Sequence, residues 1–149
     1  MALDTEYRSR DYLYGRLLAV AERLESVALN VAGENRRTTA ERYMQQFAAR
    51  PFHTWRDIEL ALDPYKARLN NNGRVGFLVN CEKELDDIQN MFDRADFCSD
   101  AKLSGEFLLG YHCQKMAYRK SKAAVQDEPD NSSETSETSA TSNESTSQE

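Results

Sequence analysis

The feature that most constrains the fold is an apolar stripe in the segment from Asp11 to Val31. Its members recur alternately four and three residues apart, and they are Leu13, Leu17, Val20, Leu24, Val27 and Val31. This spacing places their side chains on one face of an α-helix. Gly33 stands where such a helix would end. The segment therefore predicts a long amphipathic helix that the rest of the chain has to cover.

Four later segments show the same helical spacing, separated by residues that cap or break helices. They span about residues 39–49, 54–69, 74–92 and 104–122. Thr38 and Glu41 form a T-x-x-E capping box for the first of these segments. Thr54 and Asp57 repeat that pattern for the next one, in which Pro64 predicts a kink or a division into two shorter helices. Together with the first helix, these segments make about five.

Sustained alternation of apolar and polar residues, the pattern of a half-buried strand, does not occur in the sequence. The fold class we predict is therefore all-α, a single helical bundle of about five helices. Residues 1–122 suffice for one such domain. From residue 123 to 149 the composition changes to Ser, Thr, Glu, Asn and Gln. This acidic tail has little to bury, so we expect it to be disordered.

The charge distribution separates the two parts further. All 19 Lys and Arg residues and 18 of the 25 Asp and Glu residues lie at or before Lys122. The bundle therefore carries a net charge of +1 and the tail carries −7. Because the bundle has no large basic excess, binding to nucleic acid would have to depend on a local cluster of cations.

The cations that could form such a cluster lie on or beside three of the expected helices. They are Arg16, Arg23, Arg36, Arg37, Arg42, Lys115, Arg119, Lys120 and Lys122. We expect them to gather on one face, where they would follow phosphates without reading bases. The alternative is that they only solvate helix surfaces. For Arg36, Arg37 and Arg42 we favour a function, since two adjacent cations in a loop gain nothing structurally.

The remaining residue types argue against an enzyme, a metal site or a cofactor site. The two histidines, His53 and His112, lack the R-x(4–6)-H spacing of helical HEPN ribonucleases, and adjacent His112 and Cys113 point about 100° apart on a helix. Each histidine is therefore expected to be packed or hydrogen-bonded. Trp55 and Tyr43 stand at core-periodic positions, so burial is favoured over base stacking.

Three further features of the sequence bear on its protein partners, on membranes and on the compartment in which the chain works. The acidic residues on the helix over 74–92 predict a solvated face, or contact with a basic protein surface. No apolar run approaches the ~20 residues of a membrane span, so no membrane partner is expected. Three widely spaced cysteines are typical of free thiols in a reducing cytoplasm.

Four motifs resemble, in the right order, the C-terminal helical domain of the large subunit of the type I-C CRISPR Cascade complex. The segment Tyr14-Gly-Arg-Leu-Leu-Ala-Val-Ala-Glu resembles that family's "GRLxAVLE" helix, and Glu41-Arg42-Tyr43 resembles its "DRY" element. Cys81-Glu-Lys-Glu-Leu is similar to "YLEKLI", and Leu103-Ser with Gly110-Tyr-His-Cys-Gln-Lys is similar to "LS…LGYYHQR". The matches cover roughly residues 11–120. The segment after Pro51 matches only loosely, and the acidic tail has no counterpart.

The resemblance implies a particular role. A chain that begins at Met1, just before this domain, resembles the family's separate small subunit, which is translated from an internal start. Such subunits are bacterial, cytoplasmic and non-catalytic. They brace the backbone and large subunits of the crRNA-containing complex, stack on a second copy, and hold the displaced non-target DNA strand of the R-loop. Two alternatives stay open: a purely structural assembly subunit without DNA contact, and a helical adaptor outside CRISPR biology.

Overall fold

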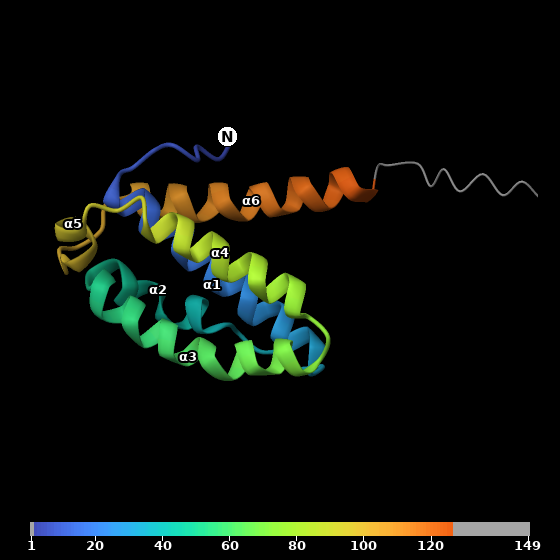
Figure 1. The fold of residues 1–149 in the computed structure, drawn as a ribbon. Coiled ribbons are helices and arrows are strands. Elements are labelled where there is room, and N and C mark those ends of the chain that lie inside the picture. The colour runs from blue at the N-terminus through green and yellow to red at the C-terminus, as the bar shows by residue number, and fades with distance from the viewer. Residues whose placement is uncertain (1, 127–149) are drawn as a thin grey trace, which may run out of the picture.

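The computed structural model describes residues 2–126, and this part of the chain is all-α. It contains six helices and no strand: α1 (Arg10–Val31), α2 (Thr39–Ala49), α3 (Pro51–Asn71), α4 (Val75–Gln89), α5 (Arg94–Cys98) and α6 (Glu106–Gln126). Figure 1 shows the long helices gathered into one bundle. The predicted fold class is confirmed, with one helix more than the five expected.

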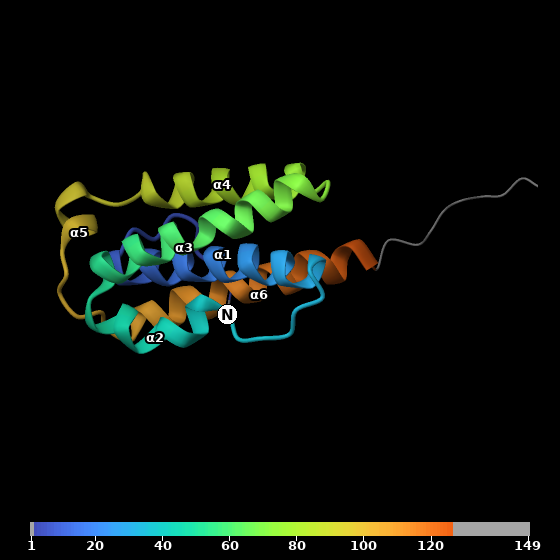
Figure 2. The same ribbon diagram turned by 90° about the horizontal axis from the view of Figure 1, so that it is seen from below.

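Helix α1 is the centre of the bundle. It packs against α2, α3, α4 and α6, and both views show it between the other helices (Figures 1 and 2). The apolar stripe accounts for this position, because Leu13, Leu17 and Leu24 are all fully buried. Burying a leucine side chain contributes roughly 1.5–3 kcal/mol, so the stripe is a large part of the driving force for folding.

Two glycines allow α1 and α6 to cross in backbone contact. A Cβ atom added to Gly15 in α1 would overlap the carbonyl oxygen of Phe107, and one added to Gly110 in α6 would overlap the carbonyl oxygen of Tyr12. The obstruction in each case is main chain, which cannot rotate away as a side chain can. The crossing therefore requires glycine on both helices.

Of the predictions made for α2 and α3, one helix cap is confirmed and the other is wrong. The Thr38 cap is confirmed, because its hydroxyl oxygen accepts a hydrogen bond from the Glu41 N–H at 3.2 Å. The cap expected at Thr54 is wrong: α3 begins earlier, with Pro51 at its first position, where a missing N–H costs nothing. The Thr54 hydroxyl instead donates to the Gln46 carbonyl at 3.2 Å. Helix α3 continues through Pro64, so it does not divide in two.

The additional helix is α5, in a segment that looked like a loop. The ring of Phe97 in α5 stacks on the Tyr14 ring of α1 and meets the rings of Phe52 and Phe92 edge-on. The backbone carbonyl of Phe97 accepts a hydrogen bond from the Tyr14 hydroxyl. Five residues are too few to show a helical period in the sequence. Helix α5 is therefore stabilised by contacts with aromatic rings that are distant in the sequence, and not by the pattern of its own residues.

The last helix ends later than expected. Helix α6 runs to Gln126, past the boundary placed at Lys122, and residues 127–149 of the acidic tail lie outside the described part of the chain. Within residues 2–126, no helix has both the length and the apolar character of a membrane span.

We predict that Gly15→Ala destabilises the protein. The added methyl group meets the α6 backbone, so the helices must separate, which costs about 2 kcal/mol. Urea unfolding followed by circular dichroism measures the loss. Gly76→Ala is the matched control, since Gly76 lies in α4 and its added Cβ meets no atom within 4 Å. That variant gains roughly 0.5–1 kcal/mol from the stiffer unfolded chain. Equal effects of the two variants would contradict the close crossing.

The cysteines give a second test of the packing. Cys81 and Cys113 are buried and Cys98 is exposed, and burial raises the pKa of the Cys81 thiol to about 11. Because the thiolate is the reactive form, iodoacetamide at about pH 8 should modify Cys98 first. Peptide mass spectrometry over time measures the order. Modification of Cys81 as fast as Cys98 in the folded protein would contradict the assigned core.

Candidate nucleic-acid interface

A basic hollow lies where α1, α4 and α6 come together. It encloses about 650 Å³ and is lined by Arg23, Val27, Arg74, Phe77, Tyr118, Arg119, Ser121 and Lys122. We call these residues the basic groove. Four of them are cationic, two are aromatic and none is acidic. The volume falls in the range of ligand sites, and the charge favours an anion.

A tight turn between α3 and α4 positions Arg74. Gly73 adopts a positive φ of 75°, which an L-residue with a side chain rarely tolerates, and this turn ends α3. The Arg74 N–H then donates to the Leu69 carbonyl at 3.0 Å, and Arg74 becomes the N-cap of α4. No side chain of the described residues caps α4 there. The positive end of the α4 dipole therefore adds to the positive potential of the groove.

Arg23 contacts both aromatic rings of the groove through its guanidinium. Its guanidinium carbon is 4.1 Å from the ring centre of Tyr118 in α6 and 5.2 Å from that of Phe77 in α4. Burial raises the pKa of Tyr118, and the nearby Glu84 carboxylate raises it further, so the ring stays neutral. The Arg23 residue itself is exposed, which leaves its charge open to a ligand.

A smaller hollow adjoins the groove beside the Arg23 side chain. It encloses about 240 Å³, and Arg23, Tyr118 and Arg119 line both hollows. Lys115 lies here as predicted, but its ammonium is 3.3 Å from the carboxylate of Glu22, which also accepts a hydrogen bond from a tyrosine hydroxyl. The charge of Lys115 is therefore already partnered, and the cations that α6 contributes to the basic groove are Arg119 and Lys122.

Arg16 is not on the surface where the sequence placed it. Only 6% of the residue is exposed, and its Nε donates to the Gln114 side-chain oxygen at 2.9 Å. Gln114 in turn donates to Glu84 at 2.6 Å, so the three side chains join α1, α6 and α4. Burial lowers the pKa of Arg16. The Arg16 guanidinium therefore lies inside the bundle and does not reach the surface, where a phosphate could contact it.

Arg36 lies on a different side of α1 and has structural partners. Its guanidinium is 3.3 Å from the Glu34 carboxylate and 3.8 Å from the buried Glu25, and it donates a hydrogen bond to Tyr65 of α3. Our inference that these loop cations gain nothing structurally is therefore wrong for Arg36. Residues 23 and 25 point about 160° apart around the helix, which is nearly opposite. The cations thus occupy two surfaces, and the single face that we expected does not form.

The other predicted cations are exposed. Arg37 makes no ion pair or side-chain hydrogen bond within residues 2–126. Arg42 donates weakly to Thr39 at 3.4 Å and lies over the Tyr43 ring at 5.9 Å. Lys120 is exposed and lines neither of the two hollows. Of the nine predicted cations, the basic groove contains Arg23, Arg119 and Lys122.

Sequence analysis missed Arg74, Phe77 and Tyr118 as site residues. Arg74 directly follows the helix-breaking run of three asparagines and a glycine at residues 70–73, and Tyr118 had the spacing of a core position. A cation directly after a helix break was the available signal for Arg74. Nothing in the sequence shows that both rings lie against Arg23, since they are far apart along the chain.

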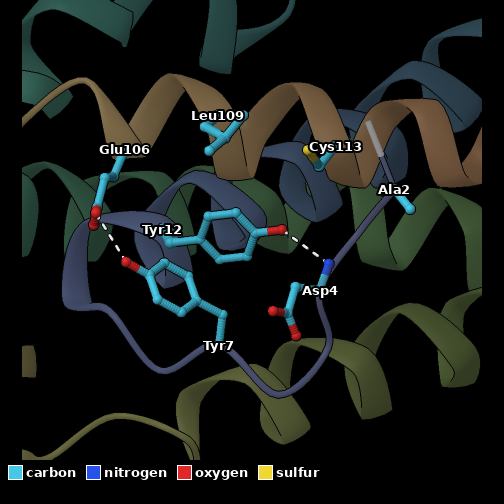
Figure 3. A pocket seen from close by; sticks show the side chains of 7 residues that line it. All are labelled: Ala2, Asp4, Tyr7, Tyr12, Glu106, Leu109 and Cys113. Atoms are coloured by element: carbon cyan, nitrogen blue, oxygen red, sulfur yellow. Dashed lines mark hydrogen bonds between the residues drawn. The ribbon is translucent and has the colours of Figure 1, made fainter.

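A third hollow, at the N-terminal end of α6, is lined by acidic rather than basic side chains. It encloses about 270 Å³ between the segment before α1 and α6, and Asp4 and Glu106 are among its lining residues (Figure 3). The Tyr7 hydroxyl donates to Glu106 at 2.8 Å, and the Tyr12 hydroxyl accepts from the Asp4 N–H at 3.0 Å. The carboxylates would repel phosphate, so this hollow is not the nucleic-acid candidate.

The acidic stripe of α4 turns partly toward α3. Of the residues expected to form it, Glu82, Asp86 and Gln89 lie in α4, with Glu84 and Asp87 beside them, whereas Asp93 lies beyond this helix as the N-cap of α5. The Glu82 carboxylate is 3.7 Å from the Lys66 ammonium of α3, and Gln89 donates to Glu59 at 3.1 Å. Asp86 remains exposed.

The aromatic residues and histidines considered as candidate site residues differ in how far they are buried. Trp55 is fully buried, as expected, whereas Tyr43 is 39% exposed and the expectation for it was wrong. Both histidines are exposed rather than packed inside, although His53 lies 3.9 Å from the Asp100 carboxylate. His112 is exposed while its neighbour Cys113 is buried, so the two form no nucleophile and base pair. No group of three metal-ligating side chains occurs in the described part of the chain.

The fold and the groove define an all-α bundle with one surface suited to an anionic ligand. Residues 1–119 match the family model described as CRISPR-associated protein (Cas_Csd1), so the chain belongs to this family of CRISPR-associated proteins. The match covers all helices from α1 to α5 and most of α6. A search of curated proteins finds no match.

We predict different effects for the two adjacent loop arginines. Arg36→Ala should lower the midpoint of thermal unfolding, because it removes the cation beside the buried Glu25 carboxylate and the hydrogen bond to Tyr65. Arg37→Ala removes the same charge from the same loop and should leave the midpoint unchanged. Differential scanning calorimetry compares the two. An unchanged midpoint for both would contradict the structural role of Arg36.

Proposed function

We propose that the chain is the non-catalytic small subunit of a type I-C Cascade complex and that it holds the displaced non-target strand of the R-loop. The observation that carries this proposal is the basic groove, in which four cations line one hollow without a carboxylate. Membership of the CRISPR-associated family supports it. The contacts are to phosphates and are independent of sequence, so the subunit slows reannealing of the strand.

The groove fits an unpaired strand by its charge arrangement. Arg23, Arg74 and Arg119 come from three different helices, so the cations border the hollow instead of forming a row on one helix. Each phosphate that contacts a cation releases condensed counterions, which makes the binding depend strongly on salt. Arg37 and Arg42 form no part of the groove, so any phosphate contact they make is a separate one.

Partner subunits are the second part of the proposal. We place this chain against the backbone and large subunits of the crRNA-containing complex and beside a second copy, in the bacterial cytoplasm. The outer side of α6 supports an assembly role, because Leu108, Leu109 and Met116 are exposed there. Exposed apolar side chains on one helix are typical of contact surfaces. The same observation favours the alternative, an assembly subunit without DNA contact.

We predict that the double variant Arg74→Ala, Arg119→Ala weakens retention of the non-target strand in the assembled complex. Loss of two phosphate contacts should reduce the slope of log affinity against log salt by roughly 1.4 units for a single strand. Fluorescence anisotropy of a labelled non-target strand, measured over a salt series, gives this slope.

The control removes two charges elsewhere. Arg56 and Arg94 are exposed and lie outside the groove lining, so the double variant Arg56→Ala, Arg94→Ala should keep the slope of the natural chain. If the groove variant and the control behave alike, the strand does not lie in the groove. The assembly role without DNA contact would then be the better account.

A further inference from the structure

The position of Arg23 shows that the groove already holds a flat group against two aromatic rings. The carbon of the planar guanidinium is 4.1 Å from the ring centre of Tyr118 and 5.2 Å from that of Phe77. Both rings are partly buried and pack against the core, which holds them in place. Tyr118 and Phe77 come from different helices, so the separation between them is set by the packing of α4 and α6 against α1.

We propose that an unpaired nucleobase takes the place of the Arg23 guanidinium, in the gap that it would leave against Phe77 and Tyr118. This inference rests on the proposed function and names the part of the strand that enters the groove. A base is flat and stacks on aromatic faces as a guanidinium does. The displaced guanidinium keeps its charge and pairs with a neighbouring phosphate.

The space around Arg23 allows this exchange. Arg23 lines both the 650 Å³ groove and the adjoining 240 Å³ hollow, so its side chain has room on either side of the rings. The residue is exposed and has no carboxylate within ion-pair distance in the described part of the chain. Leaving the gap therefore breaks two cation–π contacts and no ion pair. Stacking of a base on an aromatic side chain is stronger than an exposed cation–π contact, so the exchange is favourable.

The exchange makes the groove selective for single strands. In a duplex the bases are stacked on each other and cannot enter the gap. Every base has a flat face, so the selection tolerates any sequence. Phosphate contacts alone would not distinguish an unpaired strand from a duplex of similar charge density.

The test compares ordinary and abasic strands on the full chain at low salt, where phosphate contacts are strongest and screening is weakest. Phe77→Leu should lower the affinity for a short oligodeoxyadenylate about tenfold, by loss of one stacking face, and should leave the affinity for an abasic strand of equal length unchanged. Fluorescence anisotropy measures both affinities. Arg74→Ala is the matched control, since it should weaken binding of both strands equally.

A second variant tests the same inference without removing an aromatic side chain from the packed surface. Phe77→Trp preserves the aromatic face and adds a reporter, since the only natural tryptophan, Trp55, is fully buried. Its emission should be quenched by the ordinary strand and not by the abasic strand. Equal quenching by the two strands would overturn the base-stacking inference.

The outcomes also separate this inference from the proposed function. If Phe77→Leu binds both strands like the natural chain while Arg74→Ala weakens both, the groove holds phosphates only, and the inference fails while the proposed function stands. If neither variant changes binding, the groove is not the nucleic-acid site, and both fail. Loss of affinity confined to the ordinary strand in Phe77→Leu supports the inference.

Discussion

The backbone contact between α1 and α6 at Gly15 and Gly110 sets the geometry on which the rest of the structure depends. Where two helices cross without side chains between them, neither can slide or rotate without a clash with main-chain atoms. Arg23 follows Gly15 by eight residues and Tyr118 follows Gly110 by eight, which is roughly 12 Å along each helix. The guanidinium and the ring therefore meet because the crossing fixes the register of both helices.

The central position of α1 decides which of its charges remain open to a ligand. Four helices surround it, so even side chains at the border of its apolar stripe are enclosed. Arg16, Glu22 and Glu25 are all buried, and each has partners on another element. A buried charge without a partner would cost several kcal/mol, so these contacts are a condition of the fold. Arg23 differs because it emerges between α4 and α6, where the bundle opens into the groove.

Local signals predicted most of the fold, and long-range contacts explain most of the errors. The apolar stripe of α1, the Thr38 cap and the break at Gly73 depend on neighbouring residues and could be identified from the sequence. The burial of Arg16 depends on Gln114, 98 residues away, and the pairing of Arg36 with Tyr65 spans 29 residues. Spacing along one helix gives the face of a side chain but not what covers that face. The candidate site was therefore only partly predictable: its cations could be named, but not how they divide between two surfaces.

The charge balance of the bundle bears on how a strand would reach the groove. Residues 1–122 carry a net charge of only +1, so the bundle creates little long-range attraction for DNA. The groove acts within about 8–10 Å, the distance over which salt leaves charges effective. A surface of this kind is poorly suited to capture a strand from solution. It is suited to retain a strand that a larger assembly delivers at high local concentration, because short-range contacts then face little entropic cost. The weak overall charge and the concentrated groove therefore fit the proposed mechanism, in which the complex would displace the strand and this subunit would hold it.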